Sequence, residues 1–317
     1  MRRPLYRSDH NRALNPVREN ETYMQRRNLA ILAGLLAVIF WGASFVAIKI
    51  ALNQSQPSTL IVIRLGIGLC VLYPIAWMRG DLGGLSLRDH VHMILLGVIG
   101  VAGHQWLQAE GMLSAGATTA SWLSALAPAF MVILAGLFLR ERITPGQVAG
   151  LVLALGGALL VAVRNEGLEI GRGGWVSPAL LLGSAFAWAA FSIAGKIVAE
   201  RRSPLQVAVY SMTWGWLFSL CISLIQGDWT EVILFQPEVW WALIFLGAAS
   251  TGFAYALYFF ALSRSQATTI AALQYLEPLI TLVIAIVLLG EVVPTISLLG
   301  GGLILFGVAW VERAGRV

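Results

Sequence analysis

Charged side chains are scarce in this chain. Asp, Glu, Lys and Arg make up 12% of its 317 residues, and hydrophobic residues make up 58%. A soluble globular domain carries about 25% charged residues. The net charge of +5 does not create a basic domain surface, because seven of the 21 basic residues fall within the first 28 positions. This composition excludes a soluble protein and a nucleic-acid partner, and it predicts a chain whose solvent is the lipid bilayer.

Cysteine and clusters of metal-ligating residues are also lacking. Cys70 and Cys221 both lie inside apolar runs, so we expect small core residues and not a disulfide or a metal pair. No Cys/His cluster has ligand spacing, and no Gly-rich loop ends in Lys-Ser/Thr to hold ATP. We therefore expect no metal, no cofactor and no catalytic residue. An intramembrane enzyme would depend on His104 with Glu277, and His104 fits better as a satisfied core residue.

Long apolar runs are what the chain does have. A membrane-spanning helix needs about 20 mostly apolar residues. Ten such runs are present, at about 29–51, 57–78, 91–111, 117–139, 144–163, 178–199, 204–226, 239–261, 267–290 and 295–311. The hinges between them are short and rich in turn residues, so no linker holds a soluble domain. The sequence predicts an all-α membrane protein with ten transmembrane helices.

The basic residues predict how this protein is oriented. With the N-terminus in the cytoplasm, 16 of the 21 Lys and Arg residues lie on the cytoplasmic side. Only Arg164 and Arg172 lie outside, so both termini are predicted to be cytoplasmic, in a bacterial inner membrane. Residues 1–28 form an Arg-rich cytoplasmic tail that we expect to be disordered, and Met24 is a plausible alternative start.

The chain contains an internal repeat. The segments "AGATTASWLSALAPAF" (115–130) and "SQATTIAALQYLEPLI" (265–280) both read Ala-Thr-Thr and reach a proline nine residues later. Further matches follow in the same order at shifts of 150 and 147: Gly150 with Gly300, Glu141 with Glu291, Gly157 with Gly307, Trp41 with Trp188, Lys49 with Lys196, Pro57 with Pro204, and Gly68 with Gly215. The sequence therefore predicts two five-helix units, 29–163 and 178–312.

An odd number of helices in each unit has a topological consequence. The second unit must enter the membrane from the opposite side, which gives an inverted repeat. Inverted repeats place a binding site at the repeat interface near the midplane, with access that alternates between the two faces. This organisation favours a secondary carrier. A channel is the weaker alternative, because it would be expected to show rings of like residues contributed by an oligomer.

Several of these motifs resemble a known family. The stretch "FWGASFVAIKIAL" (40–52), Arg64, the paired "ATT…P" blocks and the glutamates in "LRERIT" and "LLGEVV" are similar to the drug/metabolite transporter superfamily, in particular its EamA-type members. The resemblance covers about residues 29–312 and implies ten helices in two repeats. Members export amino acids, drugs and other metabolites, so it leaves the cargo open. Gln105 and Gln108 depart from the pattern, which often has an aromatic residue there.

The strongest candidate site residue is Glu277. It lies ten residues into its span, roughly 13–15 Å deep, and so near the midplane. A charge at that depth costs about 2.5–3.5 kcal/mol, so an intramembrane carboxylate is functional by default. Pro278 beside it frees the backbone carbonyl of Gln274, and Pro128 does the same for Ser124. We expect these prolines to wall a central cavity; the alternative for Glu277 is a purely structural hydrogen bond.

The facing helices supply further candidates. Thr251, Tyr255 and Tyr258 recur at i, i+4 and i+7, which is one helical stripe. The repeat matches the two tyrosines with Gln105 and Gln108, and Trp41 with Trp188. We predict that Trp41, Gln105, Gln108, Trp188, Tyr255, Tyr258, Gln274 and Glu277 bind the substrate. For the tryptophans, packing against lipid is the competing interpretation.

Four other features of the sequence carry predictions of their own. Lys49 and Lys196 near the ends of their helices are candidate gates or proton-coupling residues together with Glu277, or they reach to the water boundary. Arg64 has no repeat partner and is expected to pair with Glu110. Glu141 and Glu291 are expected to cap or orient the next helix. The small-residue spacings from Gly146 and Ser297 in helices five and ten predict close packing, within the scaffold or in a homodimer.

These features together predict a secondary-active transporter. We expect an exporter of a small polar or amphoteric metabolite, such as an amino acid or an amino-acid-derived metallophore, that works by alternating access and is not an enzyme. The alternatives are an importer of a metabolite or vitamin with the same fold, and an intramembrane enzyme. Beyond the bilayer and this small molecule, the sequence indicates no partner.

Overall fold

The computed structural model describes residues 16–138, 143–164, 174–199, 201–226, 229–262 and 273–314. Every regular element within these ranges is a helix. The elements are α1 (Pro16–Ala51), α2 (Pro57–Met78), α3 (Leu87–Leu95), η1 (Leu96–Gly103), α4 (His104–Ser114), α5 (Ala117–Ser124), α6 (Ala127–Phe138), α7 (Pro145–Arg164), α8 (Val176–Ala199), α9 (Pro204–Gln226), η2 (Trp229–Leu234), α10 (Pro237–Ile244), η3 (Phe245–Phe253), α11 (Ala254–Leu262), η4 (Gln274–Leu276), α13 (Glu277–Leu289) and α14 (Thr295–Ala314).

Seven helical stretches in the described part are long and apolar enough to cross a membrane. They are Asn28–Ala51, Pro57–Met78, Ala117–Phe138, Pro145–Ala162, Val176–Gly195, Pro204–Gln226 and Pro237–Tyr258. The stretches Gln274–Leu289 and Thr295–Val311 are apolar but shorter. The expected span at 91–111 is helical throughout but contains four polar residues, His104, Gln105, Gln108 and Glu110. The chain is thus an all-helical, multi-pass membrane protein, and the number ten stays a prediction.

Prolines mark where several of these helices start. Pro57, Pro145, Pro204 and Pro237 each begin a helix. Proline suits the first helical position because its missing N–H has no partner there in any case, and its φ is already helical. At the other end of α13, Gly290 has a φ of 63° and closes the helix in the left-handed conformation that glycine adopts freely.

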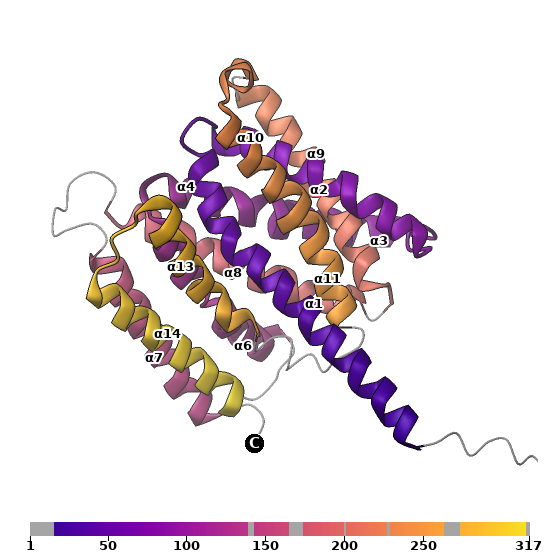
Figure 1. Cartoon of the computed structure of the whole chain (residues 1–317), viewed down its shortest axis with the longest axis horizontal. Helices are drawn as coiled ribbons and strands as arrows, with labels where there is room; N and C mark the ends of the chain where they lie inside the picture. Colours follow the sequence, from indigo (N-terminus) through magenta and orange to yellow (C-terminus); the bar gives the residue numbers. More distant parts are fainter. Residues whose placement is uncertain are drawn as a thin grey trace, which may run out of the picture.

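Helix α1 starts earlier than the sequence suggested. It begins at Pro16, so residues 16–28 of the predicted tail are helical. The early start follows from helix-forming residues such as Glu21 and Met24 that continue directly into the apolar run. In Figure 1 this N-terminal part of α1 extends beyond the rest of the bundle. Residues 1–15 lie outside the described part.

The two repeats interlock instead of packing side by side. Helix α1 of the first repeat packs against α11 and α13 of the second, and α8 of the second packs against α4 and α6 of the first. In the same way, α2 of the first repeat packs against η3 of the second, and α9 of the second packs against η1 of the first. The two π-helical segments η1 and η3 also correspond, since Leu96 and Leu246 are separated by 150 residues. Each π-helical segment leads directly into a helix, α4 or α11, that lines the cavity described below.

Helices α7 and α14 form a pair at one side of the molecule (Figure 1). Their contact is made by glycines: a Cβ on Gly150 would lie 2.7 Å from the carbonyl oxygen of Gly307, and one on Gly157 would lie 2.5 Å from that of Gly300. Because the higher number in one helix meets the lower number in the other, the two helices run antiparallel. Close packing of these helices was predicted, and it occurs within one chain.

Candidate functional site

A cavity of about 110 Å³ lies where both repeats meet. Helices α1, α2, α4, α5, α6, α8, α11 and α13 all contribute to its wall, together with the turns that precede α6 and α13. The lining residues are Trp41, Ser44, Phe45, Arg64, His104, Gln105, Gln108, Ser121, Ser124, Ala125, Ala127, Pro128, Ala185, Trp188, Tyr255, Gln274, Tyr275, Glu277 and Pro278. A water needs about 10–15 Å³ of such space, so the cavity holds several waters or a small solute.

Two helix breaks open this cavity, one in each repeat. The break between α5 and α6 lies at Ala125 and Leu126, and the equivalent break is the 3₁₀ turn Gln274–Leu276 before α13. Pro128 and Pro278 follow the two breaks as the second residues of α6 and α13, where the missing N–H of proline has no helical partner in any case. The carbonyl of Gln274, predicted to be free, accepts from the backbone N–H of Glu277. The sequence predicted these prolines as walls of a central cavity, and both line it.

Glu277 begins α13 immediately after the second break. Its carbonyl oxygen accepts a hydrogen bond from Thr281 Oγ1 (3.0 Å), which also donates to the carbonyl of Gly42 on α1 (2.8 Å). Gly42 permits this approach, because a Cβ there would lie 2.8 Å from the Glu277 carbonyl oxygen. The close contact fixes the backbone of Glu277 against α1, so its carboxyl group is held at the wall of the cavity.

Aromatic rings form one side of the cavity. Trp41 and Trp188, which correspond in the two repeats, both contact the ring of Tyr255, with centroids 5.6 and 6.3 Å apart. Trp41 Nε1 also donates to the carbonyl of Ser250 at 3.0 Å. Tyr258 lies behind this layer: its ring packs against Trp41 at 5.1 Å, and it is not among the lining residues.

Two residues that line this site also carry a buried polar atom without a partner. Gln105 and Gln108 are both 7% exposed, and both line the cavity. Within the described part, the buried atoms Gln105 Oε1 and Ser124 Oγ have no hydrogen-bond partner. Because leaving a buried polar group unpaired costs about 1–3 kcal/mol, such atoms point to a bound solute or water.

Arg64 contacts other residues than the sequence predicts. It forms no ion pair with Glu110 in the described structure. Instead its Nε donates to Thr251 Oγ1 (3.0 Å), and its Nη2 lies 3.3 Å from Ser250 Oγ. It lines the cavity at 8% exposure. Depth along the helix had suggested Glu110, but the face of α2 that carries Arg64 turns toward η3. Gly68 one turn further on was the available signal, since it lets η3 approach that face.

His104 combines two roles. Its Nδ1 lies 3.0 Å from the carbonyl oxygen and 2.9 Å from the hydroxyl of Ser184 on α8, as expected of a satisfied core histidine. Its ring also packs against Trp188, with centroids 5.3 Å apart, and it lines the cavity. It therefore ties α4 to α8 across the repeat boundary while exposing one edge to the site.

Lys49 is neither at the cavity nor directed to water. Its Nζ donates to the carbonyl oxygens of Met112 (2.7 Å), Leu113 (3.3 Å) and Ala115 (2.9 Å), which end α4. A cation at this position satisfies carbonyls that have no partner in the helix and complements the helix dipole. In this conformation Lys49 makes a capping contact, and its role as a gate or proton-coupling residue stays a prediction. The side chain of Lys196 lies outside the described part.

Glu291 makes the complementary contact. The sequence predicts that Glu291 caps or orients the next helix. Instead it lies at the start of α5 in the other repeat, where its Oε2 accepts from the backbone N–H of Thr118 at 3.4 Å. A carboxylate is stabilised at a helix N-terminus. A side chain on Gly116 would collide with this carboxylate. Glu141, its equivalent, and the second Ala-Thr-Thr block lie outside the described residues.

The chain is similar to known transporters. A model of the EamA-like transporter family matches residues 28–163 and again residues 176–313. A "probable terminal-alkyne amino-acid exporter" of Streptantibioticus cattleyicolor is 32% identical over 90% of this chain and 93% of its own length. A "probable amino-acid metabolite efflux pump" of Salmonella typhimurium is 29% identical over 86% and 91%. A solved crystal structure with 20% identity has the same fold, with a TM-score of 0.65 over 90% of this chain and 97% of that one.

Proposed function

Since the chain belongs to the EamA-like transporter family and is a multi-pass membrane transporter, we propose that it exports a small amphoteric metabolite, an amino acid or an amino-acid derivative. Relatives with 29–32% identity over most of their length carry names that specify amino-acid export or efflux. The same fold working as an importer of a metabolite or vitamin is the alternative, and it differs only in the direction of net flux.

The cavity carries the observation that favours this cargo. Arg64 and Glu277 supply a cation and a carboxyl group to the same small space. An amino acid presents the complementary pair, since the guanidinium binds a carboxylate in a forked geometry and the carboxylate of Glu277 accepts from an ammonium. Gln105 Oε1 and Ser124 Oγ, which have no partner among the described residues, add hydrogen-bonding capacity.

The aromatic layer adds selectivity to this pair of charges. Trp41, Trp188 and Tyr255 give one side of the cavity an apolar wall. A cation over the face of such rings is attracted by their quadrupole, and an apolar side chain is sheltered from water. A volume of about 110 Å³ restricts the cargo to small molecules. Tyr258 would act indirectly, by holding Trp41.

The proposed route across the membrane is alternating access between two inverted five-helix repeats. Antiparallel packing of the equivalent helices α7 and α14 supports the inversion. At the helix breaks before Pro128 and Pro278, and in the π-helical segments before α4 and α11, the backbone departs from regular α-helix. Such irregular turns at membrane depth are tolerated where they line a polar cavity, and they are suitable hinges.

The proposed setting is a bacterial inner membrane with both termini in the cytoplasm. The distribution of basic residues supports this orientation. A reporter fused to the C-terminus that is active only in the periplasm should stay silent; activity would overturn the orientation. The glycine faces of α7 and α14 are occupied by each other. A homodimer through these two helices, which we also propose, would therefore use their lipid-facing sides.

The cargo can be tested with matched analogues in liposomes that contain the purified protein. An unlabelled amino acid should compete for the transport of its labelled form at least about tenfold better than the amine without the carboxylate or the acid without the amine. Arg64→Gln should remove the preference for the carboxylate, and Glu277→Gln the preference for the ammonium. Glu110→Gln, a carboxylate outside the cavity, should change neither. Equal competition by all three analogues in the wild type would refute the proposed cargo.

A further inference from the structure

A second cavity of about 410 Å³ lies apart from the first, between α3, η1 and α8. One end is polar, with Arg88, Asp89, His92 and Arg201, and the remaining wall is apolar, with Leu95, Ile99, Phe191 and Val198 among its residues. We call this space the lateral groove. Its volume is larger than that of the central cavity, yet no residue of the predicted substrate site belongs to it.

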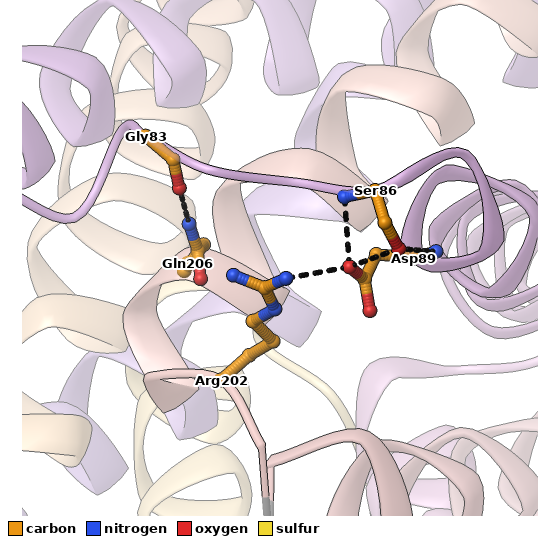
Figure 2. A network of polar contacts seen from close by, with 5 residues as sticks. All are labelled: Gly83, Ser86, Asp89, Arg202 and Gln206. Carbon is orange, nitrogen blue, oxygen red and sulfur yellow. Dashed lines mark hydrogen bonds and ion pairs between the residues drawn. The ribbon is translucent and has the colours of Figure 1, made fainter.

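The polar end of the lateral groove carries excess positive charge. Asp89 is neutralised by Arg202, whose Nη2 lies 2.7 Å from Asp89 Oδ2. The same carboxylate accepts from the backbone N–H and the hydroxyl of Ser86, at 2.9 and 2.6 Å (Figure 2). Within the described part of the chain, Arg88 and Arg201 form no ion pair. Two guanidinium groups at the mouth are therefore available to an anion.

The apolar wall is open to the surroundings of the bundle. Leu95 and Ile99, which follow one another at helical spacing on α3 and η1, are 54% and 55% exposed. Phe191 forms the floor, and it reaches this position because Gly100 has no side chain: a Cβ there would lie 2.4 Å from the Phe191 ring. In a membrane protein, exposed leucine and isoleucine at this position contact acyl chains.

We propose that the lateral groove binds an anionic phospholipid, with its phosphate on Arg88 and Arg201 and one acyl chain along Leu95, Ile99 and Phe191. Basic pockets between transmembrane helices are the sites at which proteins hold anionic headgroups. Arginine suits this role because its planar fork matches the phosphate oxygens. A water-soluble amino acid does not fit, since most of the wall offers it no polar partner. The inference depends on the chain spanning a membrane, and on neither the cargo nor the direction of transport.

The lipid would contact the wall of the central cavity through one residue. Phe191 stacks on Trp188, with centroids 5.5 Å apart and an interplanar angle of 30°. Trp188 in turn lines the central cavity. An acyl chain against Phe191 therefore restricts the rotamers of Trp188. The proposal thus predicts that anionic lipid changes transport through this pair of rings.

Photocrosslinking tests the site directly, with the full-length protein in phosphatidylcholine nanodiscs. A small fraction of phosphatidylglycerol carries a diazirine on its acyl chain, and the adducts are mapped by mass spectrometry. We expect adducts to concentrate on residues 95–100 and 190–198. Each arginine near a membrane surface contributes about a fivefold gain in affinity for anionic lipid, so Arg88→Gln with Arg201→Gln should lower it by roughly 30-fold.

Two matched variants sharpen this experiment. Arg79→Gln with Arg313→Gln removes the same charge outside the groove and should leave the adducts in place. Asp89→Asn keeps an oxygen acceptor for Ser86 but removes the negative charge and frees Arg202, so labelling should increase. Equal labelling by a phosphatidylcholine probe, equal loss in both double variants, or adducts spread over the whole apolar surface would each overturn the proposal. Displacement of the probe by a soluble amino acid would also overturn it, because the groove would then be an entrance for cargo.

Discussion

Two regions of this molecule are assembled in opposite ways. The α7–α14 pair is held by backbone against backbone, with glycines at positions 150, 157, 300 and 307 that leave no room for a side chain. The central cavity is held by long polar and aromatic side chains, such as Arg64, Trp41 and His104, which reach across the repeat boundary.

This difference separates the parts that can move from those that cannot. A glycine contact loses its packing with any shift of the two helices, since it has no flexible side chain to follow the motion. Hydrogen bonds to serine and threonine hydroxyls and tilted ring contacts can be exchanged during a rearrangement. We therefore expect alternating access to occur around the cavity, with α7 and α14 moving as one unit. Substitutions in both regions test this division between a rigid helix pair and a mobile cavity.

The largest effect is expected at Glu277. Glu277→Gln keeps the shape and hydrogen bonding of the side chain but cannot ionise, so it loses both a charged contact to the cargo and any proton coupling. Loss of a charge-assisted hydrogen bond costs about 1.5–3 kcal/mol, which corresponds to roughly 10- to 100-fold lower flux. Flux is measured in liposomes with and without a pH gradient. Glu110→Gln is the control, and normal pH-driven flux in the glutamine variant of Glu277 would leave this carboxyl group only a structural role.

The scaffold is tested by two neighbouring glycines on α7. A Cβ on Gly157 would lie 2.5 Å from the Gly300 carbonyl and 2.8 Å from the Ile304 nitrogen, whereas one on Gly156 meets nothing within 4 Å. Gly157→Ala should therefore destabilise the protein by about 1–3 kcal/mol, because neither backbone can give way. Gly156→Ala should be neutral or slightly stabilising. Equal melting temperatures of the two variants in detergent would show that α7 and α14 are not packed through this face.

How far the sequence predicted these regions depends on the repeat. A duplicated chain presents equivalent positions to the same place, so matching Gln105 with Tyr255 and Trp41 with Trp188 was sufficient to select residues that line one cavity. Tyr258 was selected by the same stripe, but one further turn moves it behind Trp41. Close packing of α7 and α14 was predicted similarly, since small residues at helical spacing require a close neighbour, but the sequence did not show that the two helices pair with each other.

Contacts between the repeats could not be predicted by matching equivalent positions. Arg64 and Thr251 are 187 residues apart in the chain, and nothing in either repeat alone indicates which face of α2 meets η3. The role of Lys49 depends on where α4 ends, and helix ends are the least certain feature of a sequence pattern. The two π-helical segments also left no signal, because a change in backbone register does not alter composition.

A smaller effect should distinguish the two equivalent tryptophans. Trp41 Nε1 donates to the Ser250 carbonyl, whereas the side chain of Trp188 makes only ring contacts in the described structure. Trp41→Phe should therefore lower both stability, by about 0.5–1.5 kcal/mol, and transport. Trp188→Phe should alter transport with little change in the melting temperature. If the two variants lose equal stability, the cavity is held more symmetrically than its hydrogen bonds indicate.

The smallest effect is expected outside both regions, at the ion pair of Asp89 with Arg202, which joins the start of α3 to the segment before α9 (Figure 2). The hydrogen bonds from Ser86 and the nearby guanidinium lower the pKa of Asp89 to about 2. An aspartate in the unfolded chain has a pKa of about 3.9. Because the folded value is the lower one, the stabilisation is complete above about pH 4–5 and is lost as the pH falls through 2. The difference in melting temperature between the wild type and Asp89→Asn should thus stay constant from pH 8 to pH 5 and shrink only at more acidic pH. If the difference in melting temperature already changes between pH 8 and pH 5, another titrating group controls the stabilisation by this ion pair. The ion pair would then belong to the contacts that rearrange.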